Sequence, residues 1–318
     1  MKLARRAVRV LLWFLLLLFI AIASFFIYLR ISARQADKKL IGDPRPLKTT
    51  IVLISIDGLR SDAIEKAGAT NLIALTRRGS STLNAQSVNP SWTVPAHVSL
   101  GTGVVPDKHG ILSNDYLRAY FLNQSGRLPT ILDFAKAREL STTAIIGKSY
   151  KPFHSYPFLS VRNLDRLVEV DGGAIEIAES ATEIISENKP AFIFIYFSAV
   201  DLAGHEFGWL SSEQLAELRE IDLAVGMIAD ALGESLDSGN TYLIVTSDHG
   251  GHDKTHGTDQ PEDMTIPWIF VGPNVRRNYK ITIPVSICDT PATIVYILDA
   301  KVPSNWDGKP VIEAFYPD

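Results

Sequence analysis

Cysteine is nearly absent from this sequence, since Cys288 is the one thiol in 318 residues. A single cysteine excludes an internal disulfide and any zinc or redox site built on a Cys-x-x-Cys pair. A metal site would therefore have to use histidine and carboxylate side chains. Basic residues are outnumbered beyond the N-terminus. Residues 1–40 hold eight of the 31 Lys and Arg residues but one of the 35 acidic residues, so the rest of the chain holds 23 basic and 34 acidic residues. The rest of the chain is strongly acidic, which argues against binding to a nucleic-acid duplex.

One long apolar run stands out near the N-terminus, where residues 11–29 carry no charge. As a helix, this run would span about 28 Å, which matches a hydrocarbon core of ~30 Å. We therefore predict a transmembrane signal-anchor helix at residues 11–29, preceded by a short basic tail at residues 1–10. A cleaved signal peptide is the alternative, since Ala21-Ile22-Ala23 fits a cleavage site, but the apolar run continues beyond it. The short tail favours a cytoplasmic N-terminus, with the globular domain periplasmic or extracellular.

The remaining chain is predicted to be a linker at residues 30–46 and a single domain at residues 47–318. Apolar, β-branched runs predict four buried strands, at Thr50–Ile56, Thr142–Ile146, Ala191–Phe197 and Thr241–Thr246. Helical spacing between the strands predicts helices over Pro129–Leu140, Ala174–Ser186 and Ser212–Leu232. This alternation predicts an α/β fold, an α/β/α sandwich with a mostly parallel central sheet.

Acidic and imidazole side chains follow three of the predicted strands. They are Asp57 after the first strand, Asp201 and His205 after the third, and Asp248, His249, His252 and His256 after the fourth. Each one alone has an ordinary explanation as a turn or surface residue. Because ligands gather at the carboxyl ends of parallel strands, we expect these side chains to meet, with enough ligands for two metal ions. Nitrogen and oxygen ligands favour zinc, and less strongly manganese.

A hydroxyl group provides a candidate nucleophile. Pro95 suits the first turn of a helix, so Thr93 is predicted to lie at a helix N-terminus, where the dipole and free N–H groups favour an anion. A metal beside Thr93 would lower the pKa of its hydroxyl. The alternative is that Thr93 is only an N-cap, but the neighbouring metal ligands favour the nucleophile.

Together these residues resemble the alkaline phosphatase superfamily, most closely its type I phosphodiesterase/nucleotide pyrophosphatase branch. The resemblance runs from about Thr50 to Gly308. It is carried by the motifs Asp57-Gly58-Leu59-Arg60, Thr93-Val94-Pro95-Ala96-His97, Asp201 with Gly204-His205, Ser247-Asp248-His249-Gly250, and His256-Gly257. The sulfatase branch is disfavoured, because Thr93 and His97 stand where that branch has the Cys or Ser and the Arg of C/S-x-P-x-R.

The resemblance implies an alkaline phosphatase-like fold with two zinc ions. The first zinc would be held by Asp57, Thr93, Asp248 and His249. The second would be held by Asp201, His205 and His256, with His252 in reserve because the spacing after His249 is shorter than in the nucleotide pyrophosphatases. Asn114 matches an asparagine that hydrogen-bonds a phosphoryl oxygen, whereas His97 and His109 match positions with a structural role.

The implied function is membrane-anchored, metal-dependent hydrolysis of phosphodiester or pyrophosphate bonds through a phospho-threonine intermediate. Thr93 would attack phosphorus, and Asn114 would stabilise the charge that develops on the phosphoryl group. The expected substrate is a small phosphodiester, a nucleotide or a phosphorylated headgroup. A phosphonate hydrolase or a phospho-headgroup transferase could use the same site. A catalytically inactive, membrane-tethered binding module is the alternative of another class, although none of the seven ligands is missing.

Overall fold

The computed structural model describes residues 13, 15–21, 24–25, 47–115, 128–147, 163–187 and 191–317. The chain forms two compact units, Met1–Asp43 and Pro44–Asp318. In the first unit the described residues are helical and exposed. Within the described ranges, no helix is both long enough and apolar enough to cross a membrane. The anchor predicted at residues 11–29 lies partly outside the described residues.

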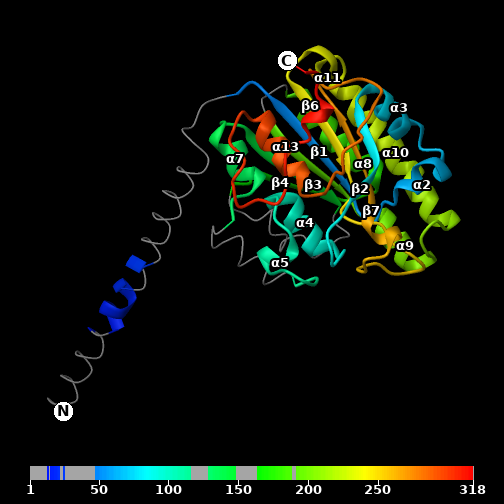
Figure 1. The fold of residues 1–318 in the computed structure, drawn as a ribbon. Helices are drawn as coiled ribbons and strands as arrows, with labels where there is room; N and C mark the ends of the chain where they lie inside the picture. Colours follow the sequence, from blue (N-terminus) through cyan, green and yellow to red (C-terminus); the bar gives the residue numbers. More distant parts are fainter. Residues whose placement is uncertain are drawn as a thin grey trace. The chain divides into compact units, whose positions relative to one another are not determined.

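A mixed sheet forms the centre of the second unit (Figure 1). Its strands are β1 Thr50–Ile56, β2 Ser80–Gln86, β3 Ser141–Gly147, β4 Arg166–Val170, β5 Ala191–Phe197, β6 Thr241–Thr246, β7 Thr265–Val271 and β8 Tyr279–Lys280. They lie in the order β4-β3-β5-β1-β6-β7-β2-β8. Strand β7 is antiparallel to its neighbours β6 and β2, and the other paired strands are parallel. The prediction of a mostly parallel sheet is confirmed.

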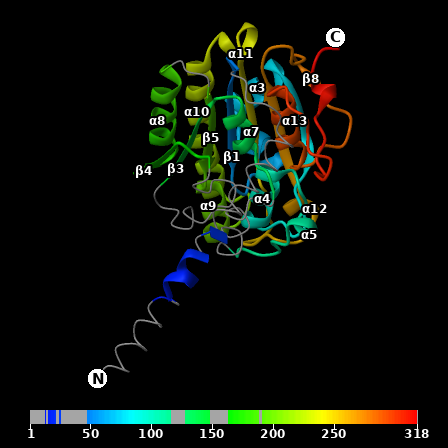
Figure 2. The same cartoon turned by 90° about the vertical axis from the view of Figure 1, so that its left-hand side faces the viewer.

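Helices cover both faces of the sheet (Figure 2). They are α2 Ser61–Ala67, α3 Thr70–Arg78, α4 Thr93–Thr102, α5 Pro106–His109, α7 Ile131–Ala137, α8 Ala174–Ser186, α9 Ala199–Phe207, α10 Ser212–Leu232, α11 Ser235–Ser238, α12 Pro261–Met264 and α13 Asp289–Ile297, with a 3-10 turn, η2, at Ile312–Ala314. Helices α2, α3, α8 and α10 share one core with the sheet. Helices α4, α7 and α13 contact one another on the other face. The fold is therefore the three-layer α/β/α sandwich that the sequence predicts.

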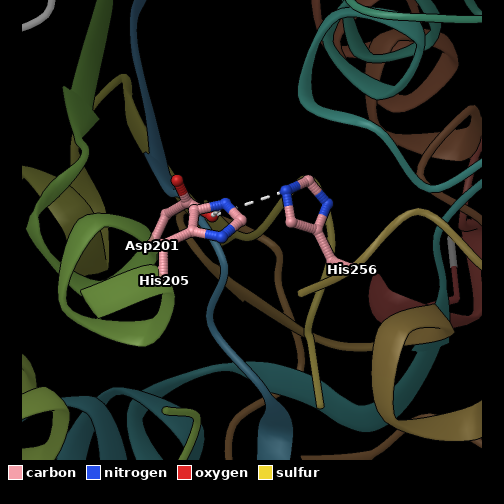
Figure 3. Close-up of side chains that lie close together, drawn as sticks. All are labelled: Asp201, His205 and His256. Carbon is pink, nitrogen blue, oxygen red and sulfur yellow. Dashed lines mark ion pairs between the residues drawn. The ribbon is translucent and has the colours of Figure 1, made fainter. Parts of the chain in front are cut away.

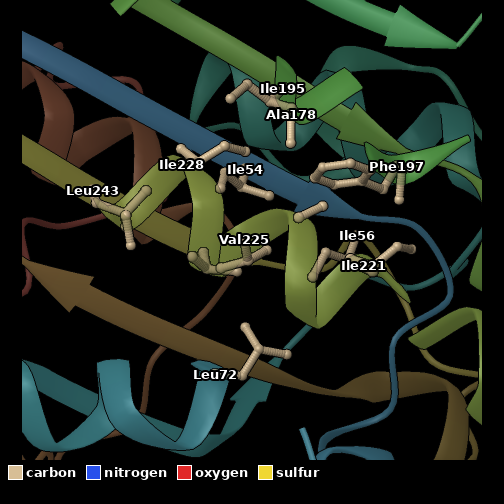
Figure 4. Close-up of a cluster of buried hydrophobic side chains, with 14 of the residues drawn as sticks. Ile54, Ile56, Leu72, Ala178, Ile195, Phe197, Ile221, Val225, Ile228 and Leu243 are labelled. Atoms are coloured by element: carbon tan, nitrogen blue, oxygen red, sulfur yellow. The ribbon is translucent and has the colours of Figure 1, made fainter. Parts of the chain in front are cut away.

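The long helix α10 anchors the core on its face of the sheet. Ile221, Val225 and Ile228 recur at helical spacing along it and are fully buried. They pack in one cluster with Ile54 and Ile56, which alternate along β1 and so point to the same face of the sheet (Figure 4). Each such side chain contributes about 1.5–3 kcal/mol on burial, so the central strands are held rigidly.

The predicted element bounds differ in their accuracy. Strands β1, β5 and β6 and helices α8 and α10 have the predicted ends, and β3 is one residue longer at each end than predicted. The helix predicted over Pro129–Leu140 is shorter, because Thr130 and Asp133 form a capping box at its start and Glu139 has a left-handed φ of 59° beyond its end. Strands β2, β4, β7 and β8 were not predicted. Strands β2 and β4 contain polar or exposed residues rather than apolar runs, and β8 has two residues, whereas the buried apolar run of β7 was a usable signal.

Candidate active site

The predicted metal ligands meet at the carboxyl ends of β5, β1 and β6, which are neighbours in the sheet. Asp57 directly follows β1, and Asp248 and His249 lie just beyond the end of β6. Helix α9 begins shortly after β5 and carries Asp201 and His205 one turn apart. Three adjacent parallel strands thus bring these side chains to one edge of the sheet.

The ligand atoms form two overlapping groups. In the first group, atoms of Asp57, Asp201 and His249 lie within 4.8 Å of one another, and in the second the same holds for Asp201, His205 and His256. Figure 3 shows Asp201 and His205 projecting from α9 towards His256. Asp201 belongs to both groups, whereas the family resemblance assigns it to one zinc only. Asp248 lies beside the first group, with its Oδ2 3.3 Å from Nε2 of His249.

Three histidines of these groups are oriented by backbone carbonyl groups. In each ring Nδ1 lies close to a carbonyl oxygen, at 2.7 Å for His249 and Gly250, 2.9 Å for His256 and Ser91, and 3.0 Å for His205 and Lys254. Because a carbonyl oxygen can only accept, Nδ1 carries the proton, and in the neutral ring Nε2 keeps its lone pair. This arrangement is typical of histidines that bind metal through Nε2.

Each Nε2 atom faces a carboxylate oxygen. Nε2 of His249 is 3.1 Å from Oδ1 of Asp57. Those of His205 and His256 lie 3.5 Å and 3.7 Å from Oδ1 of Asp201. Among the described residues, Oδ1 of Asp57, Oδ1 of Asp201 and Oδ2 of Asp248 are buried without a hydrogen bond. Lone pairs that converge in this way repel one another unless a cation lies between them, so the donor set fits divalent metal ions.

Without a metal, protons balance the charge of these carboxylates. Burial, and then the charge of Asp57, raises the pKa of Asp201 to about 8. Burial and the same charge also raise the pKa of Asp248 well above its usual value. Burial by itself would lower the pKa of His249, but Asp248 and Asp57 outweigh it and raise that pKa to about 10. A bound cation would displace such protons, because metal ligands must be deprotonated.

Thr93 lies at the start of a helix, as predicted. It is the first residue of α4, after the N-cap residue Trp92, and no side chain caps this end of the helix. Its hydroxyl oxygen is 3.2 Å from Nε2 of His249, so it lies beside the first ligand group. Asn114 reaches the same helix end, where its Oδ1 accepts a hydrogen bond of 2.9 Å from the N–H of Val94. The predicted nucleophile, the predicted phosphoryl-binding residue and the predicted metal ligands therefore converge.

His252 lies outside both ligand groups. The Nδ1 atom of His252 is 2.7 Å from Oδ1 of Asp263, and the Nε2 atom of His252 is 3.4 Å from Nε2 of Gln260. Asp263 is fully buried and also accepts hydrogen bonds from the N–H and the hydroxyl of Thr258. His252 is thus part of a network that shapes the loop after β6.

His97 is buried beneath the site. Its Nδ1 is 2.9 Å from the carbonyl oxygen of Thr93 and 3.3 Å from Oδ2 of Asp248, and its Nε2 is 3.2 Å from the hydroxyl of Ser55. His109 contacts the hydroxyl of Ser99 at 3.2 Å, within the layer formed by α4 and α5. Burial lowers the pKa of each of these two histidines to about 4, so both are neutral at pH 7.

The aromatic residues Tyr196 and Trp92 also reach the site, although the sequence did not predict this for either. Tyr196, on β5, donates a hydrogen bond from its hydroxyl to Oδ2 of Asp57. Trp92 packs against His256 edge to face, with ring centroids 4.9 Å apart. A hydroxyl inside the apolar run of β5 was a usable signal, since a buried hydroxyl needs a partner. Trp92 gave no such signal, because its contact depends on two segments distant in sequence.

Solved structures of alkaline phosphatase type share this fold. The wild-type alkaline phosphatase PafA superposes with a TM-score of 0.65 at 14% identity, over 86% of this chain and 99% of that chain. Murine ectonucleotide pyrophosphatase/phosphodiesterase 5, solved in an inactive form in complex with AMP, gives a TM-score of 0.68 at 14% identity, over 84% of this chain and all of that chain. At such identities the likeness shows the fold alone, which is the alkaline phosphatase-like α/β fold.

Sequence comparison defines the family more closely. The family model described as type I phosphodiesterase/nucleotide pyrophosphatase matches residues 51–264, so the chain belongs to that family. An uncharacterised pyrophosphatase/phosphodiesterase of Schizosaccharomyces pombe is 26% identical over 250 residues, which cover 74% of this chain and 51% of that relative. The chain thus spans about half the length of this relative, and about a quarter of the mammalian and venom relatives that it also matches.

Divalent metal is expected to stabilise the folded protein, because only the fold brings the ligands together. Zinc at about 100 times its dissociation constant should add about 2.7 kcal/mol to the free energy of unfolding, measurable as a higher Tm. The raised pKa of Asp201 stabilises the metal-free fold at low pH, and this contribution is lost as the pH rises through about 8. Since the metal needs deprotonated ligands, the gain in Tm should be larger near pH 8 than near pH 6.

The control for this measurement is a pair of Asp→Asn variants. Asp201→Asn removes the carboxylate common to both ligand groups and should lose most of the gain. Asp230→Asn changes an exposed residue of α10 and should keep the full gain in Tm on adding zinc. An equal gain in Tm for the wild type and both variants would show that zinc binds elsewhere.

Proposed function

We propose that this chain is a metal-dependent hydrolase of phosphodiester or pyrophosphate bonds that forms a phospho-threonine at Thr93. The position of the Thr93 hydroxyl carries the proposal. It lies at the start of α4 and 3.2 Å from Nε2 of His249, the atom that is also 3.1 Å from Oδ1 of Asp57. A nucleophile, an anion-binding helix end and a metal-binding donor set then meet at one point. The family of the chain supports the type of bond.

Zinc fits the donor set best, because its ligands are imidazole nitrogens and carboxylate oxygens. One ion would be held by Asp57, Thr93, Asp248 and His249, and the other by Asp201, His205 and His256. The position of Asp201 in both groups supports two neighbouring ions rather than two independent sites. When bound, the ions would supply positive charge that polarises the phosphoryl oxygens and lowers the pKa of the nucleophile.

The reaction then follows from the positions of the protein's own groups. The hydroxyl of Thr93 loses its proton to water as its oxygen forms a bond to phosphorus and the bond to the leaving oxygen breaks, and the leaving group takes up a proton from water. Water later hydrolyses the phospho-threonine, which releases the phosphate and restores the hydroxyl of Thr93. Asn114 is oriented by the N–H of Val94 through its Oδ1, which leaves its Nδ2 to donate to a phosphoryl oxygen. The N–H of Thr93 and the dipole of α4 favour the same negative charge.

A nucleotide is the substrate class that the comparisons support. The murine structure with this fold was solved in complex with AMP, and the family is described as nucleotide pyrophosphatase. A hydrolysis screen with a nucleotide phosphodiester, a dinucleoside pyrophosphate, a phosphomonoester, a phosphonate and a sulfate ester tests the proposal. Turnover of the first two should exceed that of the other three, and a preference for the sulfate or phosphonate would contradict it.

Removing the nucleophile provides the first mutational test. Thr93→Ala should lower kcat by about 10³-fold or more while the fold and most zinc binding stay intact, because the covalent step is lost but the carboxylate and imidazole ligands remain. Thr102→Ala is the matched control, since Thr102 lies at the other end of α4 and donates its hydroxyl to the carbonyl of Val98. Turnover in Thr93→Ala at the level of the control would rule Thr93 out as the nucleophile.

The histidines after β6 provide a second test. His256→Ala should reduce both zinc stoichiometry and kcat strongly, because its Nε2 faces Asp201 in the second ligand group. His252→Ala should leave the zinc stoichiometry unchanged, because its ring contacts Asp263 instead. Metal analysis of the two purified variants decides the assignment, which is wrong if His252→Ala is the variant that loses zinc.

We further propose that residues 11–29 anchor the enzyme in the membrane, with the domain periplasmic or extracellular. The uncharged run has the length of a membrane span and follows four basic residues. Full-length protein should therefore stay with membranes after washing with carbonate or salt, because screening of charges does not weaken a hydrophobic anchor. A variant that begins at residue 44, where the second unit starts, is the control and should be recovered in solution. Release of the full-length chain by either wash would contradict the anchor.

A further inference from the structure

Trp209 lies where the ligand-bearing segments meet. It follows the end of α9 by two residues, and its side chain is buried, with 8% exposed. The indole N–H donates a hydrogen bond of 2.9 Å to the carbonyl of Gly58, the residue after Asp57. Its ring centroid lies 5.2 Å from that of His205 and 5.9 Å from that of His256. The side chain therefore contacts His205 and His256 of the second ligand group. Its hydrogen bond to Gly58 also connects it to the turn after Asp57, which belongs to the first group.

Two glycines make room for the indole ring. A Cβ atom on Gly204, which lies between Asp201 and His205, would be 2.9 Å from the ring of Trp209. A Cβ atom on Gly251, two residues after His249, would be 2.1 Å from it. Both distances are too short for carbon atoms, so any larger residue would displace the ring. The indole thus packs directly against the backbone of α9 on one side and of the loop after β6 on the other.

Backbone hydrogen bonds fix the position of Trp209. Its own N–H donates to the carbonyl of Asp253 at 2.7 Å, in the loop between His249 and His256. The N–H of the next residue, Leu210, donates to Oε1 of Gln214 at 2.6 Å, and Nε2 of Gln214 donates to the carbonyl of Val200 at 3.0 Å. These bonds hold the backbone of Trp209 and Leu210 to the loop after β6 and, through Gln214, to α9.

We propose that Trp209 is a positioning residue that sets the spacing between the two ligand groups. The inference rests on the proposed two-metal function, in which ions about 3.5–4 Å apart require ligands placed to within about 0.5 Å. His205 depends on this support most, because 42% of its side chain is exposed. Its Nδ1 is held by the carbonyl of Lys254, next to the Asp253 carbonyl that binds the backbone of Trp209. The indole links α9, the Gly58 turn and this loop, so the two groups keep one relative position.

Trp209→Phe is the variant that tests this role. It keeps an aromatic ring in the same space but removes the hydrogen bond to Gly58 and part of the contact with Gly204 and Gly251. Trp306→Phe is the matched control, because the side chain of Trp306 is 7% exposed and also packs on a glycine, with a Cβ on Gly103 placed 2.4 Å from its ring. Gly103 is at the far end of α4 from Thr93. Both variants lose the same atoms from a buried indole.

The readout is zinc affinity, measured by competition with a chromophoric chelator, together with Tm of the metal-free proteins. Trp209→Phe should bind at least one zinc about 10–100-fold more weakly than the wild type, as expected when a residue that orients ligands is changed. Its kcat should recover towards the wild-type value as zinc is raised. Trp306→Phe should keep wild-type zinc affinity, even if its Tm falls by as much as the Tm of Trp209→Phe.

Two outcomes would overturn the assignment, and they can be told apart from a failure of the proposed function. If Trp209→Phe binds zinc as tightly as the wild type, Trp209 has no positioning role, and the proposed metal sites are unaffected. An equal loss of affinity in Trp306→Phe would show a general effect of stability and not of position. A wild-type protein that binds no zinc would overturn the proposed function itself, and the role of Trp209 with it.

Discussion

Three carboxylates buried within a few ångströms of one another are the constraint on which the rest of this structure depends. Asp57, Asp201 and Asp248 are 0%, 5% and 0% exposed. Buried like charges are strongly unfavourable unless hydrogen bonds and cations compensate them. Oδ1 of Asp248 accepts from the N–H groups of Gly58 and His249, and Oδ2 of Asp57 accepts from the hydroxyl of Tyr196. One oxygen of each carboxylate then remains free to bind a cation.

The sheet provides the rigidity that this arrangement needs. Strand β1 pairs in parallel with β5 and β6, with Ile56 opposite Phe197 and Ser55 opposite Thr246, so the three strands end at nearly the same level. All residues of β5 are buried, and α10 packs on the central strands over its length. Because the strand ends cannot shift independently, the side chains that follow them have fixed relative positions.

The family match and the complete fold do not have the same extent. The matched region ends at residue 264, yet β7 starts at Thr265 and pairs with both β6 and β2. Helix α13, also beyond the match, lies on the same face as α4, the helix that carries Thr93. The described residues after residue 264 therefore pack against β6 and α4, which position the site, but they contribute none of the proposed ligands. It completes the sheet beside β6, from whose end Asp248 and His249 extend.

The sequence by itself determined the class of fold and pointed to the residues of the candidate site. Apolar runs such as Ala191–Phe197 predict buried strands because a parallel strand covered on both faces has no solvent side, and Asp57 and Asp248 stand out because they follow such runs. The order of the family motifs along the chain then added Thr93 to the predicted site. Only the tertiary structure decided that Asp201 belongs to both ligand groups, and that His256 and not His252 faces it. It also revealed Tyr196 and Trp209 as partners of the site. These contacts join residues far apart in the chain, and their geometry depends on strand order and packing, which no local pattern encodes.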